Sequence, residues 1–240
     1  MKYPPRWLGE SYLKLLSEFF YKPFTIEEAR LLLKTDDKLT RVILSELCKR
    51  ELIIRLKRGL YLALSPYSII IKERSWQEKI QQKEYIPLIS VIASRLIERY
   101  DGRLVSIVIF GSVARGKAKP TSDLDLLVVV ENLPERYSER VSQVVELFDD
   151  VKEVKLWLWK EKKIFCNIEV LILTPEEAQE FQPLYLDMVE DSIIIYDRTD
   201  FFKSVLEKVA EKLRELRAEK VALPGDRWFW RLSSSEEVRS

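Results

Sequence analysis

Two apolar stretches, residues 104–110 and 124–130, constrain the fold of this chain more than any other feature. Each is rich in valine, isoleucine and leucine, as is typical of a β-strand buried on both faces. The first stretch ends at the Gly-Ser pair of residues 111–112, and the second is entered through the Asp-Leu-Asp of residues 123–125. The pattern therefore predicts two neighbouring core strands, with polar groups gathered where one ends and the other begins.

Asp123 and Asp125 are two residues apart at the start of the second stretch. Because side chains alternate faces along a strand, both carboxylates should project to one side while Leu124 and Leu126 enter the core. Paired carboxylates without a cation repel each other, and carboxylate oxygens are ligands that suit Mg²⁺ or Mn²⁺. A divalent metal site explains their placement better than fold stability does.

The loop that follows the first stretch has residue types suited to a phosphate group. Gly111 lets the backbone approach a ligand without a Cβ in the way. Ser112 and the free amides of a following helix start can hold a phosphate oxygen. Arg115 and Lys117 add positive charge near where a triphosphate would lie.

Composition narrows the chemistry. The chain has no histidine, which excludes a histidine general base, a Ser-His-Asp triad and a His-ligated zinc. Catalysis must then rest on carboxylates, lysines, hydroxyls or hard metal ions. Cys48 and Cys166 show no disulfide or zinc spacing. No apolar run approaches the roughly 20 residues of a membrane span, and Met1–Pro5 lacks an apolar signal core. We therefore expect a cytoplasmic protein with no membrane segment.

Outside the two core stretches, helical and strand patterns alternate along the chain. We expect helices at 86–100, 135–148, from the Thr174-Pro175 cap onward, and at 201–219, and further strands at 154–159, 166–173 and 192–196. The Trp157/Trp159 and Trp228/Trp230 pairs alternate at strand spacing, and we interpret them as core or interface residues. This order predicts an α/β (α+β) fold in which helices flank a mixed sheet.

The first 64 residues follow a different pattern. Three helices are expected at 11–20, 25–33 and about 37–50, the second opened by a capping box of Thr25 and Glu28. A β-hairpin over 52–64 follows, with a Gly-containing turn at 57–59. This order resembles the winged-helix DNA-binding domain.

In that resemblance the third helix would present Lys38, Thr40, Arg41 and Ser45 outward, and the wing tip would be Lys57 and Arg58. Lys38, Arg41, Lys57 and Arg58 are the candidate phosphate and groove contacts for a nucleic acid. A winged helix also serves as a protein-docking or dimerisation module. Both interpretations stay open.

Charge supports a division of the chain. Residues 1–75 carry 15 Lys and Arg against 9 Asp and Glu, whereas the remaining 165 residues carry 25 against 30. A basic front piece followed by a mildly acidic body indicates two modules with different partners. We expect a winged helix-turn-helix domain at 1–75, an α/β domain at 84–198 after a linker, and a C-terminal helix and strand extension at 199–240 that packs on the α/β domain.

The motifs Gly-Ser-x-Ala-Arg-Gly at 111–116 and Ser-Asp-x-Asp-Leu at 122–126 resemble those of the DNA polymerase β-like nucleotidyltransferase superfamily. The chain is similar to its minimal archaeal and bacterial members, which include antitoxins of MNT–HEPN systems. The resemblance covers residues 84–175, and later residues resemble more loosely archaeal proteins that join a winged helix to such a domain. It implies a nucleotidyltransferase domain at 84–198 and adds Ser122 to the phosphate-binding candidates.

The resemblance also implies a third carboxylate on a neighbouring strand, for which Glu169 is the candidate. An acidic residue buried within an apolar strand is costly unless a cation pairs with it. The alternative is a strand-edge glutamate paired with Lys or Arg, and aspartate is the commoner residue of the family here. By resemblance, Asp123, Asp125 and Glu169 would be the catalytic residues and would hold Mg²⁺ or Mn²⁺.

The reaction implied is transfer of a nucleoside monophosphate from an NTP to a hydroxyl, with Gly111 and Ser112 at the β- and γ-phosphates. Three classes of protein stay open. The first is an active transferase that modifies a nucleic acid, a protein or a small molecule. The second is an antitoxin that nucleotidylates or binds a toxin-like partner. The third is a DNA-binding regulator with an inactive transferase fold. A homodimer is also open.

Overall fold

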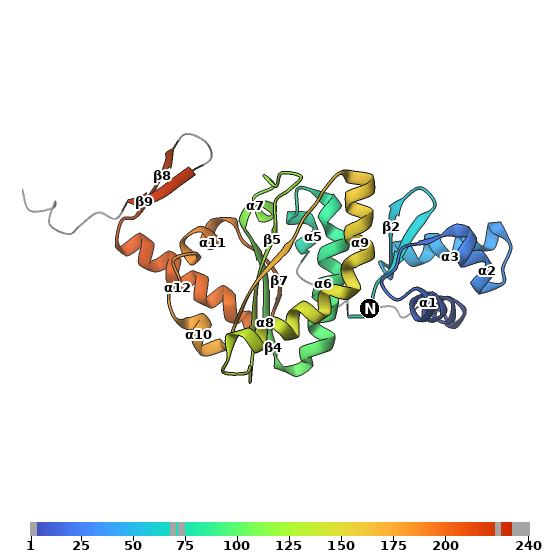
Figure 1. The fold of residues 1–240 in the computed structure, drawn as a ribbon, viewed down its shortest axis with the longest axis horizontal. Coiled ribbons are helices and arrows are strands. Elements are labelled where there is room, and N and C mark those ends of the chain that lie inside the picture. Colours follow the sequence, from blue (N-terminus) through green and yellow to red (C-terminus); the bar gives the residue numbers. More distant parts are fainter. Residues whose placement is uncertain (1–3, 68–70, 72–74, 224–226, 232–240) are drawn as a thin grey trace, which may run out of the picture.

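The computed structural model describes residues 4–67, 71, 75–223 and 227–231. Its centre is a four-stranded sheet with the order β6-β5-β4-β7 (Figure 1). The strands are β4 (Leu104–Phe110), β5 (Leu124–Val130), β6 (Ile168–Leu173) and β7 (Ile193–Asp197). β4 runs antiparallel to both β5 and β7, whereas β5 and β6 are parallel. The sheet is therefore mixed, as the sequence predicts.

The residues of β5 explain why its sequence is a continuous apolar run. Leu126 and Val128 pack into a core with the helix α6 (Ile86–Tyr100), while Leu127 and Val129 pack into a separate core on the other face. Both faces of the strand are thus buried, as in sheets covered by helices on both sides. The second face is covered by α10 (Pro175–Gln179), α11 (Tyr185–Asp191) and α12 (Phe201–Glu215) (Figure 1).

The N-terminal module has its own core beneath three helices and a small sheet. Its elements are α1 (Arg6–Phe19), β1 (Phe24–Thr25), α2 (Ile26–Leu33), α3 (Asp37–Lys49), β2 (Ile53–Lys57) and β3 (Leu60–Ala63), with the strand order β1-β3-β2. Thr25 and Glu28 form the expected capping box at α2, and the Asp36 side chain accepts a hydrogen bond from the Leu39 amide to cap α3.

Direct contacts join this module to the α6 side of the sheet. The Tyr21 hydroxyl donates a hydrogen bond of 2.8 Å to Glu98 Oε1 on α6. The Arg95 guanidinium of α6 lies over the Tyr21 ring, 5.9 Å from its centroid. At the tip of β2, Lys57 forms a 2.7 Å ion pair with Glu161. The N-terminal module therefore lies beyond α6, on the side of the sheet opposite to α11 and α12 (Figure 1).

The strand predicted at 154–159 is wrong. These residues form α9 (Lys152–Trp157) and a π-helical turn, Leu158–Lys162. Val154, Trp157 and Leu158 are buried, and their spacing is that of one helix face, whereas Trp159 is 53% exposed. The alternating Trp157 and Trp159 suggested strand spacing, but burial against the core follows the helical period.

Other boundaries shift modestly. The helix expected at 135–148 is α8 (Tyr137–Val145) followed by a 3₁₀ segment, Glu146–Val151. The helix expected to end at residue 219 ends at Glu215, and a hairpin of β8 (Glu219–Leu223) and β9 (Arg227–Arg231) follows. The sequence also predicts a turn at Pro224-Gly225, which lies outside the described residues, as do 68–70 and 72–74. The linker between 75 and 84 contains the short helix α5 (Trp76–Lys79). Within the described part of the chain, no helix has the length and apolarity to cross a membrane.

Candidate active site

Gly111 and Asp125 form the centre of the candidate site. Phe110, the last residue of β4, pairs in register with Asp125 of β5, which brings the following glycine against the carboxylate. A Cβ added to Gly111 would lie 2.9 Å from Asp125 Cγ, and Gly111 has a φ of +69°. Only glycine combines this left-handed backbone with so close an approach to a neighbouring side chain. The glycine expected from the sequence is therefore required by two independent features.

Asp125 and Glu169 share one face of the sheet, and Asp123 is expected to share it. Asp125 shares its face of β5 with Leu127 and Val129, which pack beneath α11 and α12. Asp123 is two residues earlier and is predicted by strand alternation to project the same way. On the parallel neighbour β6, Glu169 is the register partner of Asp125.

Glu169 is exposed, which corrects the expectation that it is buried within its strand. The strand begins at Ile168 rather than at residue 166, so Glu169 is its second residue. In addition, β6 is an edge strand of the sheet. An exposed carboxylate at a strand end needs no cation to offset burial, so its position beside Asp125, rather than its burial, links it to the site.

The surroundings of Asp125 disfavour its charged form. Burial raises the pKa of the Asp125 carboxyl, and the negative charges of Asp123 and Glu169 raise it further. The positive charge of Arg115 opposes this shift. A carboxyl surrounded in this way gains most from a bound cation, because the cation offsets the like charges around it.

The described residues contain no group of three or more acidic or cysteine side chains drawn together closely enough to hold a metal ion. Asp123, Asp125 and Glu169 are therefore neighbours rather than a complete ligand set in this arrangement. Their chemistry fits a hard divalent cation, since all three offer oxygen ligands. The partial burial of Asp125 beside two further acidic residues favours a cation there, and the same surroundings raise its pKa.

A cavity of about 290 Å³ opens beside Gly111 and Asp125. It combines the motif residues with groups that the sequence did not indicate. Its lining residues are Phe110, Gly111, Arg115, Asp125, Leu184, Asp187, Met188, Asp191 and Trp228. α11 and β9 thus form one side of the candidate site. The only sequence signal for Trp228 was its alternation with Trp230, which we had interpreted as core or interface.

The phosphate-binding candidates lie on α7 (Gly111–Ala114) and the loop behind it. Arg115 lines the cavity. Lys117 is exposed, and its amide donates a hydrogen bond of 2.9 Å to the Ser112 carbonyl. The Ser122 hydroxyl accepts a hydrogen bond of 2.9 Å from the Lys119 amide, so it closes a turn of the loop rather than facing the cavity.

The nucleic-acid candidates lie apart from this site, on the N-terminal module. Lys38, Arg41, Lys57 and Arg58 are all exposed. Arg41 pairs with Asp37 at 2.8 Å, and Lys57 pairs with Glu161 at 2.7 Å. Thr40 does not point outward as expected: it is buried, and its hydroxyl donates to the Asp36 carbonyl.

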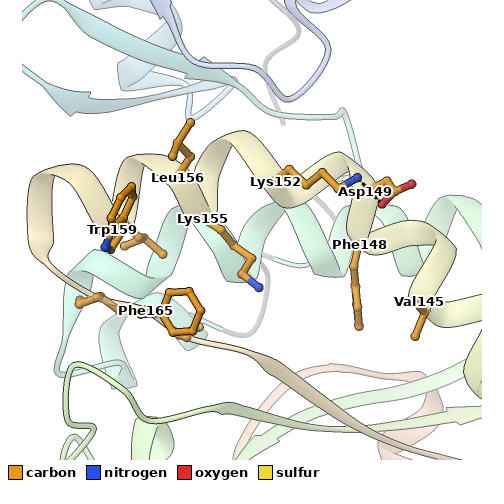
Figure 2. A pocket seen from close by; sticks show the side chains of 11 residues that line it. Val145, Phe148, Asp149, Lys152, Lys155, Leu156, Trp159 and Phe165 are labelled. Carbon is orange, nitrogen blue, oxygen red and sulfur yellow. Dashed lines mark ion pairs between the residues drawn. The ribbon is translucent and has the colours of Figure 1, made fainter.

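A second cavity, of about 420 Å³, lies between α9 and the segment before β6. Figure 2 shows Lys155 of α9 and Phe165 beside each other, with Trp159 on the π-helical turn that follows α9. None of the predicted site residues lines this groove. Its wall nevertheless approaches the carboxylates, because the Asn167 carbonyl, next to the lining residue Cys166, accepts a 2.9 Å hydrogen bond from the Leu124 amide between Asp123 and Asp125. Burial raises the pKa of Cys166 to about 11.

Comparisons with known proteins identify the family of this chain. A family model described as a nucleotidyltransferase domain matches residues 89–223. A Methanocaldococcus jannaschii protein named "Putative protein adenylyltransferase MJ1305" is 32% identical over 122 residues, which are 50% of this chain and 77% of that protein.

Solved structures of toxin–antitoxin proteins are also similar. One, a toxin–antitoxin with AMP-PNP, is 12% identical, with a TM-score of 0.29, and the match covers 52% of this chain and 90% of that chain. A second, a mutant of the toxin–antitoxin MntA-HpeT, is 12% identical, with a TM-score of 0.30, over 51% of this chain and 88% of that chain.

The family match spans the sheet, the Gly-Ser turn and all three candidate carboxylates. The mixed sheet with helices on both faces is consistent with the fold of that family. The chain therefore belongs to the nucleotidyltransferase domain family and is an NTP-using transferase.

Proposed function

We propose that this protein transfers a nucleoside monophosphate from an NTP to a hydroxyl group at the cavity beside Gly111 and Asp125. The acceptor oxygen forms a bond to the α-phosphorus, the bond from that phosphorus to the bridging oxygen breaks, pyrophosphate leaves, and the acceptor loses its proton. The observation that supports the proposal is the register pairing of Asp125 with Glu169, next to a glycine that allows close approach, with the charge of Asp123 acting on Asp125.

Asp123, Asp125 and Glu169 would hold Mg²⁺ or Mn²⁺ through their oxygen atoms. Such ions stabilise the attacking and leaving oxygens of an in-line displacement. Glu169 is the most exposed of the three, and its carboxylate is the group best placed to take the proton of the acceptor hydroxyl. The absence of histidine from the sequence agrees with a reaction that relies on carboxylates.

Ser112 and the amides at the start of α7 would hold the β- and γ-phosphates, with Arg115 supplying positive charge from within the cavity. Lys117 lies on the loop that follows. This loop is fastened at Ala118, whose amide and carbonyl both bond the Gln82 side chain, at 3.0 and 2.9 Å. A loop fastened in this way can present its cations with little ordering on substrate binding.

For the donor and acceptor, we propose ATP and a protein hydroxyl. The support is the name of the M. jannaschii relative, which describes a protein adenylyltransferase and shares 32% identity with this chain over 122 residues. The matched segment covers half of this chain. The family match, at residues 89–223, leaves the N-terminal module outside it.

The domain organisation that we propose is a winged helix at 1–75, a transferase domain at 84–198 and an extension at 199–240. Three helices followed by a hairpin, with β1 added to the wing strands, support the winged-helix assignment. The exposed Lys38 and Arg58 support a role in holding a macromolecule. A DNA-binding or antitoxin-type protein with a weak or inactive transferase site is the second candidate, and the same exposed cations favour it.

Nucleotide binding tests the proposal. Calorimetry with ATP, CTP, GTP and UTP, with and without Mg²⁺, would be run on the wild-type protein and on the Asp123→Ala/Asp125→Ala double variant. We expect Mg²⁺-dependent binding of ATP that the double variant loses. If none of the four nucleotides bound the wild type, the transferase proposal would be wrong and the regulator would replace it.

A further inference from the structure

The C-terminal hairpin reaches the candidate site through the side chain of Trp228 on β9. The Arg115 guanidinium lies over the indole ring of Trp228, with its Cζ atom 5.0 Å from the ring centroid. Trp228 and Arg115 both line the cavity that contains Asp125. The hairpin therefore contributes a wall to the cavity, although more than 100 residues separate it from the Gly-Ser motif.

Several contacts hold this tryptophan in place. Its Nε1 donates a hydrogen bond of 2.6 Å to Asp187 Oδ1 on α11. On the paired strand β8, the Lys220 ammonium lies 4.7 Å from the same ring and forms ion pairs with Glu190 at 2.7 Å and Asp191 at 3.5 Å. The acidic residues Asp187, Glu190 and Asp191 of α11 thus hold the hairpin in place, and these contacts set the orientation of the indole.

Arg115, Asp125 and Trp228 line the same cavity, so the arginine has both a carboxylate and an aromatic ring near it. The face of the indole attracts the same guanidinium, because an aromatic ring presents negative charge density on its faces. Without the ring, the arginine could approach Asp125 and neutralise the carboxylate where a cation is proposed to bind.

We infer that Trp228 is a positioning residue, which holds the Arg115 guanidinium at the wall of the cavity so that it meets the triphosphate of the NTP. This inference rests on the proposed function, since it assigns a role within the same nucleotide site. Trp228 acts through Arg115, so its contribution concerns the phosphates and not the base or ribose. The hairpin β8–β9 then contributes a positioning residue to the nucleotide site.

The test compares Trp228→Ala, Trp228→Phe, Arg115→Ala and the double variant Trp228→Ala/Arg115→Ala in the full chain. Phe229→Ala is the matched control, because Phe229 is the neighbour of Trp228 on β9 and is 43% exposed. Calorimetry gives the Kd of each protein for ATP and for adenosine with Mg²⁺, and steady-state kinetics give KM and kcat for ATP. The fold of each variant is checked by its thermal unfolding transition.

We expect Trp228→Ala to weaken ATP binding by about fivefold to tenfold, the effect of losing one cation–π contact. The loss should appear in KM more than in kcat and should be absent for adenosine. Trp228→Phe should recover most of the affinity, because a phenyl ring still attracts the guanidinium. Phe229→Ala should match the wild type.

The double variant tests whether Trp228 affects ATP binding through Arg115. If Trp228 acts through Arg115, the double variant binds ATP no more weakly than Arg115→Ala alone. Additive losses, or an equal loss for adenosine, would overturn the inference and identify the indole as a surface for the base or ribose. An absence of ATP binding in the wild type would instead reject the proposed function, so the two failures are distinguishable.

Discussion

Gly111 occupies a position where the carboxylate of Asp125 leaves no room for a side chain. Gly111 directly follows the last residue of β4 and has a φ of +69°. An added Cβ would lie 2.9 Å from Asp125 Cγ and 3.3 Å from Asp125 Cβ. Real Cβ atoms essentially never lie within 3.0 Å of such an atom. The backbone at Gly111 and the orientation of Asp125 therefore depend on each other.

Gly111→Ala should cost roughly 1–3 kcal/mol of folding stability and move the Asp125 carboxylate, because the methyl group meets both the positive φ and the side chain. Urea unfolding measures the first effect and Mg²⁺-dependent nucleotide binding the second. Gly102→Ala is the control, since no atom lies within 4 Å of its added Cβ. Equal stabilities of the two variants would contradict the contact.

Asp125→Asn should abolish Mg²⁺-dependent turnover, a loss on the order of 100-fold or more. In EDTA the same variant should be more stable than the wild type by about 0.5–2 kcal/mol, because it removes a partly buried charge that lies near Asp123 and Glu169. Chemical denaturation measures the gain, with the exposed Glu211→Gln as control. A variant less stable than the wild type in EDTA would show that the carboxylates do not repel one another.

The stability gain of Asp125→Asn should shrink as the pH falls. The pKa of Asp125 is raised in the folded protein by burial and by its acidic neighbours, so its protonation favours folding and its ionisation disfavours folding. The raised pKa lies above the ordinary value of about 3.9 for aspartate. When the pH falls below it, the Asp125 carboxyl of the wild type becomes neutral, like the side-chain amide of the Asn variant. Unfolding midpoints of both proteins in EDTA at several pH values test this. A constant difference would mean that the charge of Asp125 is not the cause.

Tyr21→Phe should weaken the attachment of the N-terminal module by about 1–2 kcal/mol, because it leaves Glu98 without the hydroxyl that bonds it at 2.8 Å. Tyr100→Phe is the matched control. The buried Tyr100 hydroxyl makes no hydrogen bond within the described part of the protein, so its removal should be neutral or slightly stabilising. Thermal unfolding compares the two variants. Equal losses would mean that the hydroxyl of Tyr21 contributes nothing.

Lys38→Ala/Arg58→Ala should weaken binding to a DNA duplex, if the N-terminal module binds DNA through these exposed cations. Each lost phosphate contact should reduce the slope of log K against log salt by about 0.9. Fluorescence anisotropy at several salt concentrations measures it, with the exposed Lys14→Ala on α1 as control. If the wild type bound no duplex, the module would be assigned to protein docking.

The sequence predicted those elements whose residue pattern lies within a single segment of the chain. The strands 104–110 and 124–130, the helix 86–100 and the capping box at Thr25 are confirmed at their expected residues. The strand expected at 154–159 failed because the two tryptophans have strand spacing, whereas the buried set that includes Val154 and Trp157 follows the helix period.

The candidate site was only partly predictable for a related reason. Asp123 and Asp125 belong to one motif, so their spacing alone indicates a shared role. The parallel pairing of Glu169 with Asp125, the hydrogen bond from Trp228 to Asp187 and the exposure of Glu169 depend on how distant segments meet. Periodicity within a segment carries no information on such pairings.

The central sheet separates the N-terminal module from the chemistry. The module contacts α6 and the turn after α9, whereas Asp125 lies on the face covered by α11 and α12. If the N-terminal module binds the acceptor, as proposed, the acceptor must extend around an edge of the sheet to reach Asp125. The groove of Figure 2 lies between α9 and the segment before β6, and its lining residue Cys166 is three residues before the exposed Glu169 of this edge strand. We would then expect a flexible tail to be modified more readily than a rigid, compact surface.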